Sequence, residues 1–251
     1  MRKKSNSGIR VVGWHFINND YSLSLKHNNK IIKVKPGLKL HTRPEDLEIC
    51  NNGLHASIRI VDACLYAKGW KLCRVVSSGG IDSHDNKYAT TEREVLYIIN
   101  FKSLIKQWAI NAFSSLIRNL DILKHREKIS FNAAEKEFIK LADIVMNGIM
   151  DHNFDSKKAG KILTSEFLSE LNLNMLETGH SKYCKDFSAA LYRFGLSLTH
   201  TSPYYIRATF QYFIEAYNVI TGKNINFDNI EASLIKLEMD EKRLIPPNIK
   251  K

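Results

Sequence analysis

The sequence predicts an α+β protein, in which a small β-rich domain over residues 1–101 is followed by an all-helical domain over residues 102–251. Up to Phe101, short apolar segments rich in β-branched and aromatic residues alternate with clusters of Asn, Gly, Asp and Ser, a pattern typical of strands joined by turns. After Phe101, apolar residues recur at helical spacing instead. A chain of 251 residues with 44% hydrophobic and 25% charged residues is long and apolar enough for one large core or two small ones.

Strands are expected in the first domain over residues 9–17, 30–34, 71–77 and 95–101. They are separated by the turn-forming sequences Asn28-Asn29, Pro36-Gly37, Asn51-Asn52-Gly53 and Gly79-Gly80. One helix is expected over residues 57–67, with Ser57 as its N-cap and Gly69 as its stop signal.

The second domain begins with an apolar stripe at helical spacing, formed by Leu104, Ile105, Trp108, Ala112, Leu116, Ile117 and Leu120. Further helices are expected over residues 130–150, 157–171, 181–198, 203–221 and 228–237. Pro203 is suited to the first turn of its helix, and Gly222 to the end of the same helix. No Gly-, Ser- or Pro-rich linker separates the two domains, so we expect the helices to pack directly on the first domain.

The chain is strongly basic, with a formal net charge of +11 and a sequence pI of about 9.4. The excess is densest in residues 1–100, which contain 16 basic and 9 acidic residues. A polyanionic partner, first of all a nucleic acid, is therefore expected. The expected nucleic-acid-binding side chains are Lys33, Lys35, Lys39 and Arg74, on a basic surface that also includes Lys3, Lys4 and Arg10. Scattered lysines also serve solubility, which is the alternative interpretation.

No apolar run approaches the roughly 18 residues that a membrane span requires, and no signal-type apolar stretch follows the N-terminus. We therefore expect a cytoplasmic protein with no membrane partner. Its cysteines, Cys50, Cys64, Cys73 and Cys184, are expected to be reduced thiols. The first three, together with His55, offer four ligands for zinc but contain no Cys-x-x-Cys pair. Buried cysteines are the preferred interpretation, and no metal is expected.

Three candidate catalytic residues come from the ends of different predicted elements. His15 lies in the first strand, His55 at the entrance to the first helix, and Glu92 before the last strand. Residues at element ends often meet in one cleft. The alternatives are a packed structural histidine at position 15, a solvated charge cluster around Arg93, and a turn glycine with positive φ at position 53.

This arrangement resembles the ADP-ribosyltransferases whose triad is His, Tyr and Glu. In that family a strand carries His-Gly, a glycine-containing segment with the tyrosine leads into a helix of the form Ser-Ala-x-Tyr, and a glutamate precedes a late strand. The corresponding segments here are Trp14-His15, residues 53–56 followed by 62–66, and Glu92 or Glu94, with His55 at the position of the tyrosine.

The chain is also similar to an uncharacterised family that is common in phages and prophages. The motifs of that family are Trp-His near the start, Cys-x-x-Gly-Leu-His-Ala-Ser, Asp-Ala-x-x-Tyr-Ala, and Lys-x-x-Ala-x-x-Glu-Arg-x-Val-Leu. They correspond here to residues 14–15, 50–57, 62–67 and 87–96, in the same order. The resemblance implies a phage–host context, including antiviral defence, and no particular activity.

A cleft of this composition suits the cleavage of an N-glycosidic bond, because a carboxylate beside the ribose stabilises the positive charge that develops on the sugar. Glu92 is expected to be this carboxylate, and His15 and His55 to bind the sugar or the leaving base. The expected substrate-binding residues are Trp14, Gly53, Tyr66 and Glu94. The resemblance implies NAD as the co-substrate, with ADP-ribose transferred to nucleic acid. The alternatives are a DNA glycosylase that removes a base, and a phage-associated protein that binds nucleic acid without catalysis.

Overall fold

A computed structural model describes residues 3–5, 10–25, 30–43, 45, 47–49, 52–127 and 203–244. The chain divides into two compact units, of which the first comprises Met1–Ser103 and Ser202–Tyr204, and the second Leu104–Thr201 and Tyr205–Lys251. All strands of the described residues lie in the first unit. Together with the long helices of the second unit, they make this an α+β protein, as the sequence predicts.

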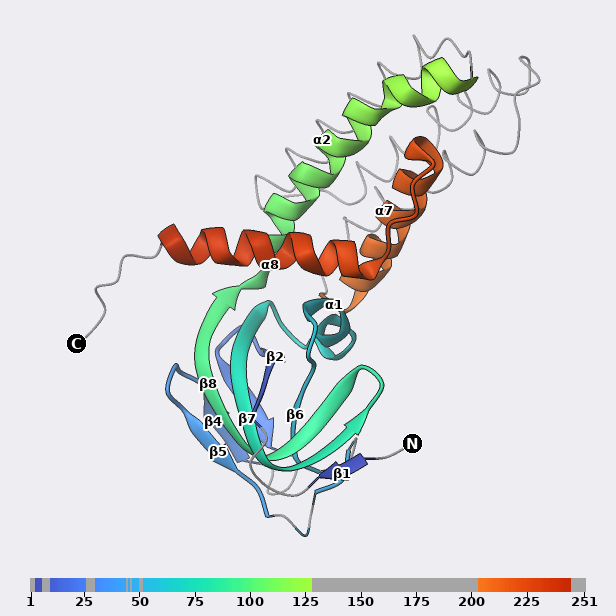
Figure 1. Ribbon diagram of the computed structural model, residues 1–251. Helices are drawn as coiled ribbons and strands as arrows, with labels where there is room; N and C mark the ends of the chain where they lie inside the picture. Colours follow the sequence, from blue (N-terminus) through green and yellow to red (C-terminus); the bar gives the residue numbers. More distant parts are fainter. Residues whose placement is uncertain are drawn as a thin grey trace. The chain divides into compact units, whose positions relative to one another are not determined.

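The first unit is built around two 14-residue strands, β7 (Lys71–His84) and β8 (Lys87–Asn100), which form an antiparallel hairpin. On the outer edge of β7 lie β1 (Lys3–Ser5) and β2 (Val11–Ile17), and on the outer edge of β8 lie β5 (Lys39–His41) and β6 (Leu54–Ala56). A separate two-stranded sheet consists of β3 (Ser22–Leu25) and β4 (Lys30–Lys33). Figure 1 shows the two long strands curving together along their whole length.

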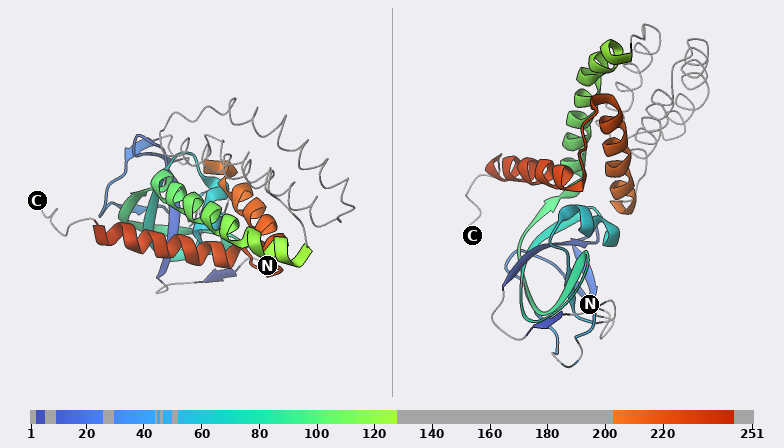
Figure 2. Two further views of the ribbon diagram at one scale, coloured as in Figure 1. Left: turned by 90° about the horizontal axis from the view of Figure 1, so that it is seen from above. Right: turned by 45° about the vertical axis from the view of Figure 1, so that its right-hand side comes forward.

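One pair of residues closes the six-stranded sheet into a ring. Trp14 of β2 and Ser57, which follows β6, exchange two backbone hydrogen bonds, with N···O distances of 2.7 and 3.0 Å. Because β2 also pairs with β7, and β6 with β8, the order β2-β7-β8-β6 returns to its first strand. The strong curvature of these strands is visible in the right-hand view of Figure 2.

The sequence predicts the positions of the central strands but not their lengths. Residues 71–77 and 95–100 belong to strands twice as long as predicted, because Gly79-Gly80 forms a bulge within β7 rather than a turn, and Phe101 begins α2. Gly79 adopts a φ of +78°, which lets two residues of β7 face Thr91 alone on β8. The hairpin turn is instead Asp85-Asn86. The short strands β1, β3, β5 and β6 are not predicted.

The helix predicted over residues 57–67 is wrong in its extent. The structure has one helical turn, α1 (Ile60–Ala63), followed by the 3-10 turn η3 (Cys64–Tyr66). Ser57 cannot cap this helix, because its backbone is paired with Trp14, and the cap position is occupied by Arg59 in an extended conformation. The predicted helix start therefore belongs to the ring of strands.

The second unit contains most of α2 (Phe101–Glu127), together with α7 (Ile206–Thr221) and α8 (Phe227–Leu244). The 3-10 turn η4 (Pro203–Tyr205) precedes α7, and Gly222 ends α7 with a φ of +68°, as predicted. Trp108 packs edge-on against Phe210 and Phe213, with ring centroids 4.8 and 5.5 Å apart. The helices predicted over residues 130–150, 157–171 and 181–198 lie outside the described residues. No described helix combines the length and apolar character needed to cross a membrane.

Candidate functional site

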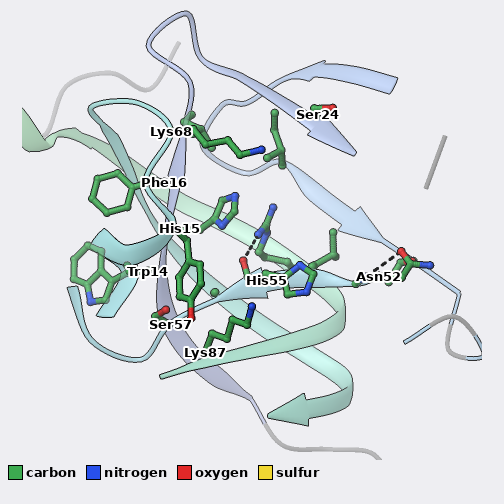
Figure 3. Close-up of a pocket in the computed structure, with 18 of the residues that line it drawn as sticks. Trp14, His15, Phe16, Ser24, Asn52, His55, Ser57, Lys68 and Lys87 are labelled. Atoms are coloured by element: carbon green, nitrogen blue, oxygen red, sulfur yellow. Dashed lines mark hydrogen bonds between the residues drawn. The ribbon is translucent and has the colours of Figure 1, made fainter. Parts of the chain in front are cut away.

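A cavity of about 780 Å³ opens in the first unit. This volume lies within the range of small-molecule binding sites, about 300–1,000 Å³. The wall is contributed by β2, β3 and β6, by the segments around residues 41–43, 52–57 and 63–68, and by two side chains of β8. Figure 3 shows His15, His55, Lys68 and Lys87 gathered around the same space. The structure thus brings together the two histidines that the sequence selects.

The cavity wall is positively charged. Its charged and titratable side chains are Arg43, Lys68, Lys87 and Arg93, and the histidines His15, His41 and His55. No aspartate or glutamate is among the described residues that line it. A wall of this kind attracts anions and repels metal ions and other cations.

Arg93 forms the inner part of this wall. It projects from the middle of β8, is only 4% exposed, and donates a hydrogen bond of 2.8 Å from Nη1 to the backbone oxygen of His55. Burial lowers its pKa to about 10, so the guanidinium is still charged at neutral pH. Its Nε is buried and has no hydrogen-bond partner among the described residues.

His15 lies beside this guanidinium on β2. Its pKa is lowered well below 6.5, first by burial and then by the positive charges of Arg93 and His55, while a hydrogen bond to the backbone of His55 acts in the opposite direction. The imidazole is therefore neutral at neutral pH. Its Nε2 is buried, and no described residue forms a hydrogen bond with it.

Two aromatic residues predicted to bind substrate also line the cavity, in different ways. Tyr66 is 43% exposed, donates a hydrogen bond of 2.6 Å to Asn86 Oδ1, and has the ammonium of Lys87 4.6 Å from its ring centroid. Trp14 is 1% exposed, and the guanidinium of Arg74 lies 4.3 Å from the centroid of its ring. Tyr66 is thus accessible to a ligand, whereas Trp14 is mainly a core residue.

Gly53 lies at the bend that leads into β6 and has a φ of +120°. A Cβ at this position would lie 2.9 Å from Leu47 Cδ1 and 3.0 Å from Ala89 Cβ. The residue therefore has a structural reason to be glycine, since both its backbone conformation and its surroundings disfavour a side chain. Its role in the site is to let the chain turn close to the sheet before His55.

The structure does not place Glu92 in the cavity wall. Glu92 lies within β8 rather than before it, because this strand begins at Lys87. Its side chain is exposed, accepts a hydrogen bond of 2.8 Å from Ser78 Oγ, and lies 4.0 Å from Nδ1 of His41, which does line the cavity. Glu94 is likewise outside the wall and lies 4.0 Å from Nζ of Lys39.

Arg93 is not predicted as a site residue from the sequence, although the structure places it in the cavity wall. A signal for it exists in the alternation of residues 91–95, where Thr91, Arg93 and Val95 are buried and the two glutamates between them are not. Alternate residues of a strand share a face, so an arginine that alternates with Val95 is expected to point inward. The two flanking glutamates conceal this signal by making the segment appear uniformly exposed.

The predicted nucleic-acid-binding residues lie apart from this wall. Lys33 donates to Asp20 at 3.1 Å, Lys39 lies 4.0 Å from Glu94, and Lys35 is exposed. Arg74 covers Trp14 as described above. Two of the expected phosphate-binding lysines therefore already have acidic neighbours.

The described cysteines are buried thiols. Cys64 and Cys73 are both thiols, and burial raises the pKa of Cys73 to about 12. Cys50 and Cys184 lie outside the described residues. Within the described ranges, no group of three or more His, Cys, Asp or Glu side chains is placed to hold a metal ion.

Comparison with curated proteins and with solved structures gives no match. Comparison with family models gives one match, which covers residues 11–107 and carries the description Domain of unknown function (DUF7666). The wall of the cavity, from Trp14 to Arg93, falls entirely within this segment. The segment that builds the cavity is therefore similar to an uncharacterised family.

Proposed function

We propose that the first unit binds a nucleotide in this cavity and cleaves an N-glycosidic bond, as an ADP-ribosyltransferase-like enzyme. The proposed context is the interaction of a phage with its host. The observation that carries the proposal is the composition of the wall, in which four cationic side chains and three histidines meet without a carboxylate among the described residues. Nucleotides bring negatively charged phosphates and a planar base. The cationic side chains can form charge-assisted hydrogen bonds with the phosphates, and the accessible ring of Tyr66 can stack on a base.

In the proposed reaction, the bond between the ribose carbon C1′ and the nicotinamide nitrogen of NAD breaks, and its electron pair leaves with nicotinamide. An oxygen or nitrogen of the acceptor nucleic acid forms the new bond to C1′ and gives up a proton. His15 is the proposed base, because a neutral imidazole accepts a proton and its Nε2 is buried without a partner among the described residues. His55 is proposed to contact the ribose.

Glu92 has a changed role in this proposal. Because it does not line the cavity, it is proposed to act as a positioning residue through His41, which it approaches to 4.0 Å. At that distance the carboxylate can orient the imidazole of His41 at the wall of the cavity. Glu94 has the same chemistry and the same exposed side of β8, but its neighbour is Lys39 rather than a lining residue.

The test is incubation of the full chain with three substrate mixtures: NAD alone, NAD with single- or double-stranded oligonucleotides, and the oligonucleotides alone. Nicotinamide release and modified oligonucleotides, followed by mass spectrometry, are expected in the second mixture. Abasic sites in the third mixture would identify the alternative, a glycosylase that removes a base from nucleic acid. If no mixture gives a product but oligonucleotides bind, the non-catalytic alternative replaces the enzyme.

Matched variants assign the chemistry to the cavity. His15→Gln is expected to lower the rate by roughly 10²-fold or more, in the range of general base catalysis. His84→Gln, at the exposed end of β7, is the control and is expected to leave the rate unchanged. Glu92→Gln is expected to lower the rate by a smaller factor than His15→Gln, and Glu94→Gln to leave it unchanged. Full activity of both His15→Gln and Glu92→Gln would contradict the proposed roles.

A further inference from the structure

The guanidinium of Arg93 is a buried charge that the described residues leave uncompensated. Its side chain is 4% exposed, and the hydrogen bond that it donates to a described residue goes to a backbone oxygen, that of His55. No carboxylate among the described residues forms an ion pair with it. Burying an ion without a counter-ion costs several kcal/mol, so buried charges in proteins are normally paired or bind a ligand.

The groups around Arg93 do not supply the missing negative charge. Cys73 and Tyr88 approach it, but burial raises the pKa of both groups, so the thiol and the phenol stay neutral. His15 on β2 is likewise neutral, and Lys68 adds a second positive charge on the same side. The described groups around Arg93 are therefore neutral or positive, and none of them balances its charge.

The free part of the guanidinium has the geometry of an anion receptor. The hydrogen bond from Nη1 to His55 fixes the plane of the group, whose residue lines the cavity, while Nε is buried and has no described partner. An arginine edge of this kind binds two oxygens of a phosphate side by side. The hydrogen bond to His55 holds this edge in place before a ligand arrives, which lowers the entropic cost of binding.

We propose that Arg93 anchors a phosphate-binding site, in which Lys68 contacts the same phosphate from the cavity rim and the imidazoles of His15 and His55 lie next to it. The inference deepens the proposed function, on which it rests for the identity of the ligand as a nucleotide. The site recognises the phosphate group itself. The same chemistry is present in a free nucleotide and in the backbone of a nucleic acid, and the experiment below distinguishes them.

The test is isothermal titration of the full chain with ADP, inorganic phosphate, adenosine and a short single-stranded oligonucleotide at one ionic strength. ADP is expected to bind at least about tenfold more tightly than adenosine, because loss of one charge-assisted contact costs about 1.5–3 kcal/mol. Tight binding of the oligonucleotide with weak binding of ADP would also support the site and would assign the phosphate to a nucleic-acid backbone. Equal binding of ADP and adenosine would overturn the proposal.

The variants test the anchor directly. Arg93→Gln is expected to lower ADP affinity by at least about tenfold, and Arg93→Lys by less, because lysine keeps the charge but loses the planar fork. Lys68→Gln is expected to lower the affinity for ADP about three- to tenfold, because it removes one charge contact that is partly exposed to solvent. Lys102→Gln, an exposed lysine outside the wall, is the matched control and is expected to change nothing.

Arg93→Gln alters a buried residue, so its fold is checked by circular dichroism before titration. If it folds and binds ADP within twofold of the unaltered protein, the proposal is wrong. If it does not fold, Lys68→Gln decides, and an unchanged ADP affinity in that variant overturns the proposal. The binding assay needs no bond cleavage, so absence of N-glycosidic activity would refute the proposed reaction while leaving the phosphate site standing.

Discussion

Arg93 and His15 show how one buried residue determines the chemistry of another. The positive charge of Arg93 opposes protonation of His15, and burial opposes it further. His15 and His55 can be selected from the sequence because each follows a recognisable motif. Arg93 cannot be selected in the same way, because its position between two glutamates is typical of a solvated charge cluster. Only the pairing of β8 with its neighbouring strands shows which face of β8 is buried.

The lowered pKa of His15 predicts that the first unit loses stability on acidification. The unfolded chain binds a proton at this histidine near pH 6.5, whereas the folded chain does not until the pH is well below that value. The unfolded state therefore binds more protons in this window, and the free energy of unfolding falls as the pH decreases. The slope contributed by one such group reaches about 1.4 kcal/mol per pH unit.

Urea unfolding from about pH 7.5 to about pH 5 measures this effect as the difference between variants. His15→Gln is expected to show a flatter pH dependence than the unaltered chain, since glutamine does not titrate. The groups that face His15 are Arg93 on β8, His55 on β6 and Lys68. His84→Gln controls for the removal of an exposed histidine. Identical slopes for His15→Gln and the unaltered chain would rule out the buried neutral histidine.

At the scale of elements, the sequence identifies the two long central strands and β2, and it fails on the short strands β1, β5 and β6 attached to them. β7 and β8 are rich in β-branched residues and are long enough to show a pattern. By contrast, β5 and β6 contain three residues each, and their conformation is set by pairing with β8 rather than by their own preferences. Gly79-Gly80 resembles a turn in sequence because the same positive φ serves turns and bulges.

The bulge in β7 gives a prediction with a matched control. Gly79 and Gly37 both have a φ of +78°, but a Cβ on Gly79 would overlap Thr91 Oγ1, whereas a Cβ on Gly37 would meet nothing within 4 Å. Gly37→Ala is therefore expected to cost only the backbone strain, about 1–2 kcal/mol. Gly79→Ala adds an overlap in a packed site and is expected to cost about 1–3 kcal/mol more. The measurement is the free energy of unfolding in urea, and equal losses would show that the bulge relaxes without strain.

At the scale of the whole molecule, the basic side chains of the cavity are better placed to bind a polyanion than the surface lysines predicted from the sequence. Residues 1–100 contain 16 basic and 9 acidic residues, so 7 of the 11 net positive charges lie there. Lys33 and Lys39 have Asp20 and Glu94 as close neighbours, which screen them. The cavity cations Arg43, Lys68 and Lys87 form no ion pair with any residue of the described ranges. Of these basic residues, those of the cavity therefore offer a polyanion more uncompensated charge than Lys33 and Lys39 do.

This distribution predicts which lysines determine the affinity for nucleic acid. Binding of a single-stranded oligonucleotide to the full chain, measured by fluorescence anisotropy, is expected to weaken with salt, with a log–log slope of about −0.7 for each phosphate neutralised. Lys68→Gln and Lys87→Gln are each expected to make the slope shallower by up to about 0.7, because each removes one phosphate contact. Lys33→Gln and Lys39→Gln remove charges that already have acidic neighbours, and are expected to change the slope by much less. If the four variants reduce the slope equally, the chain binds nucleic acid through its general surface charge, and the cavity is not the point of contact.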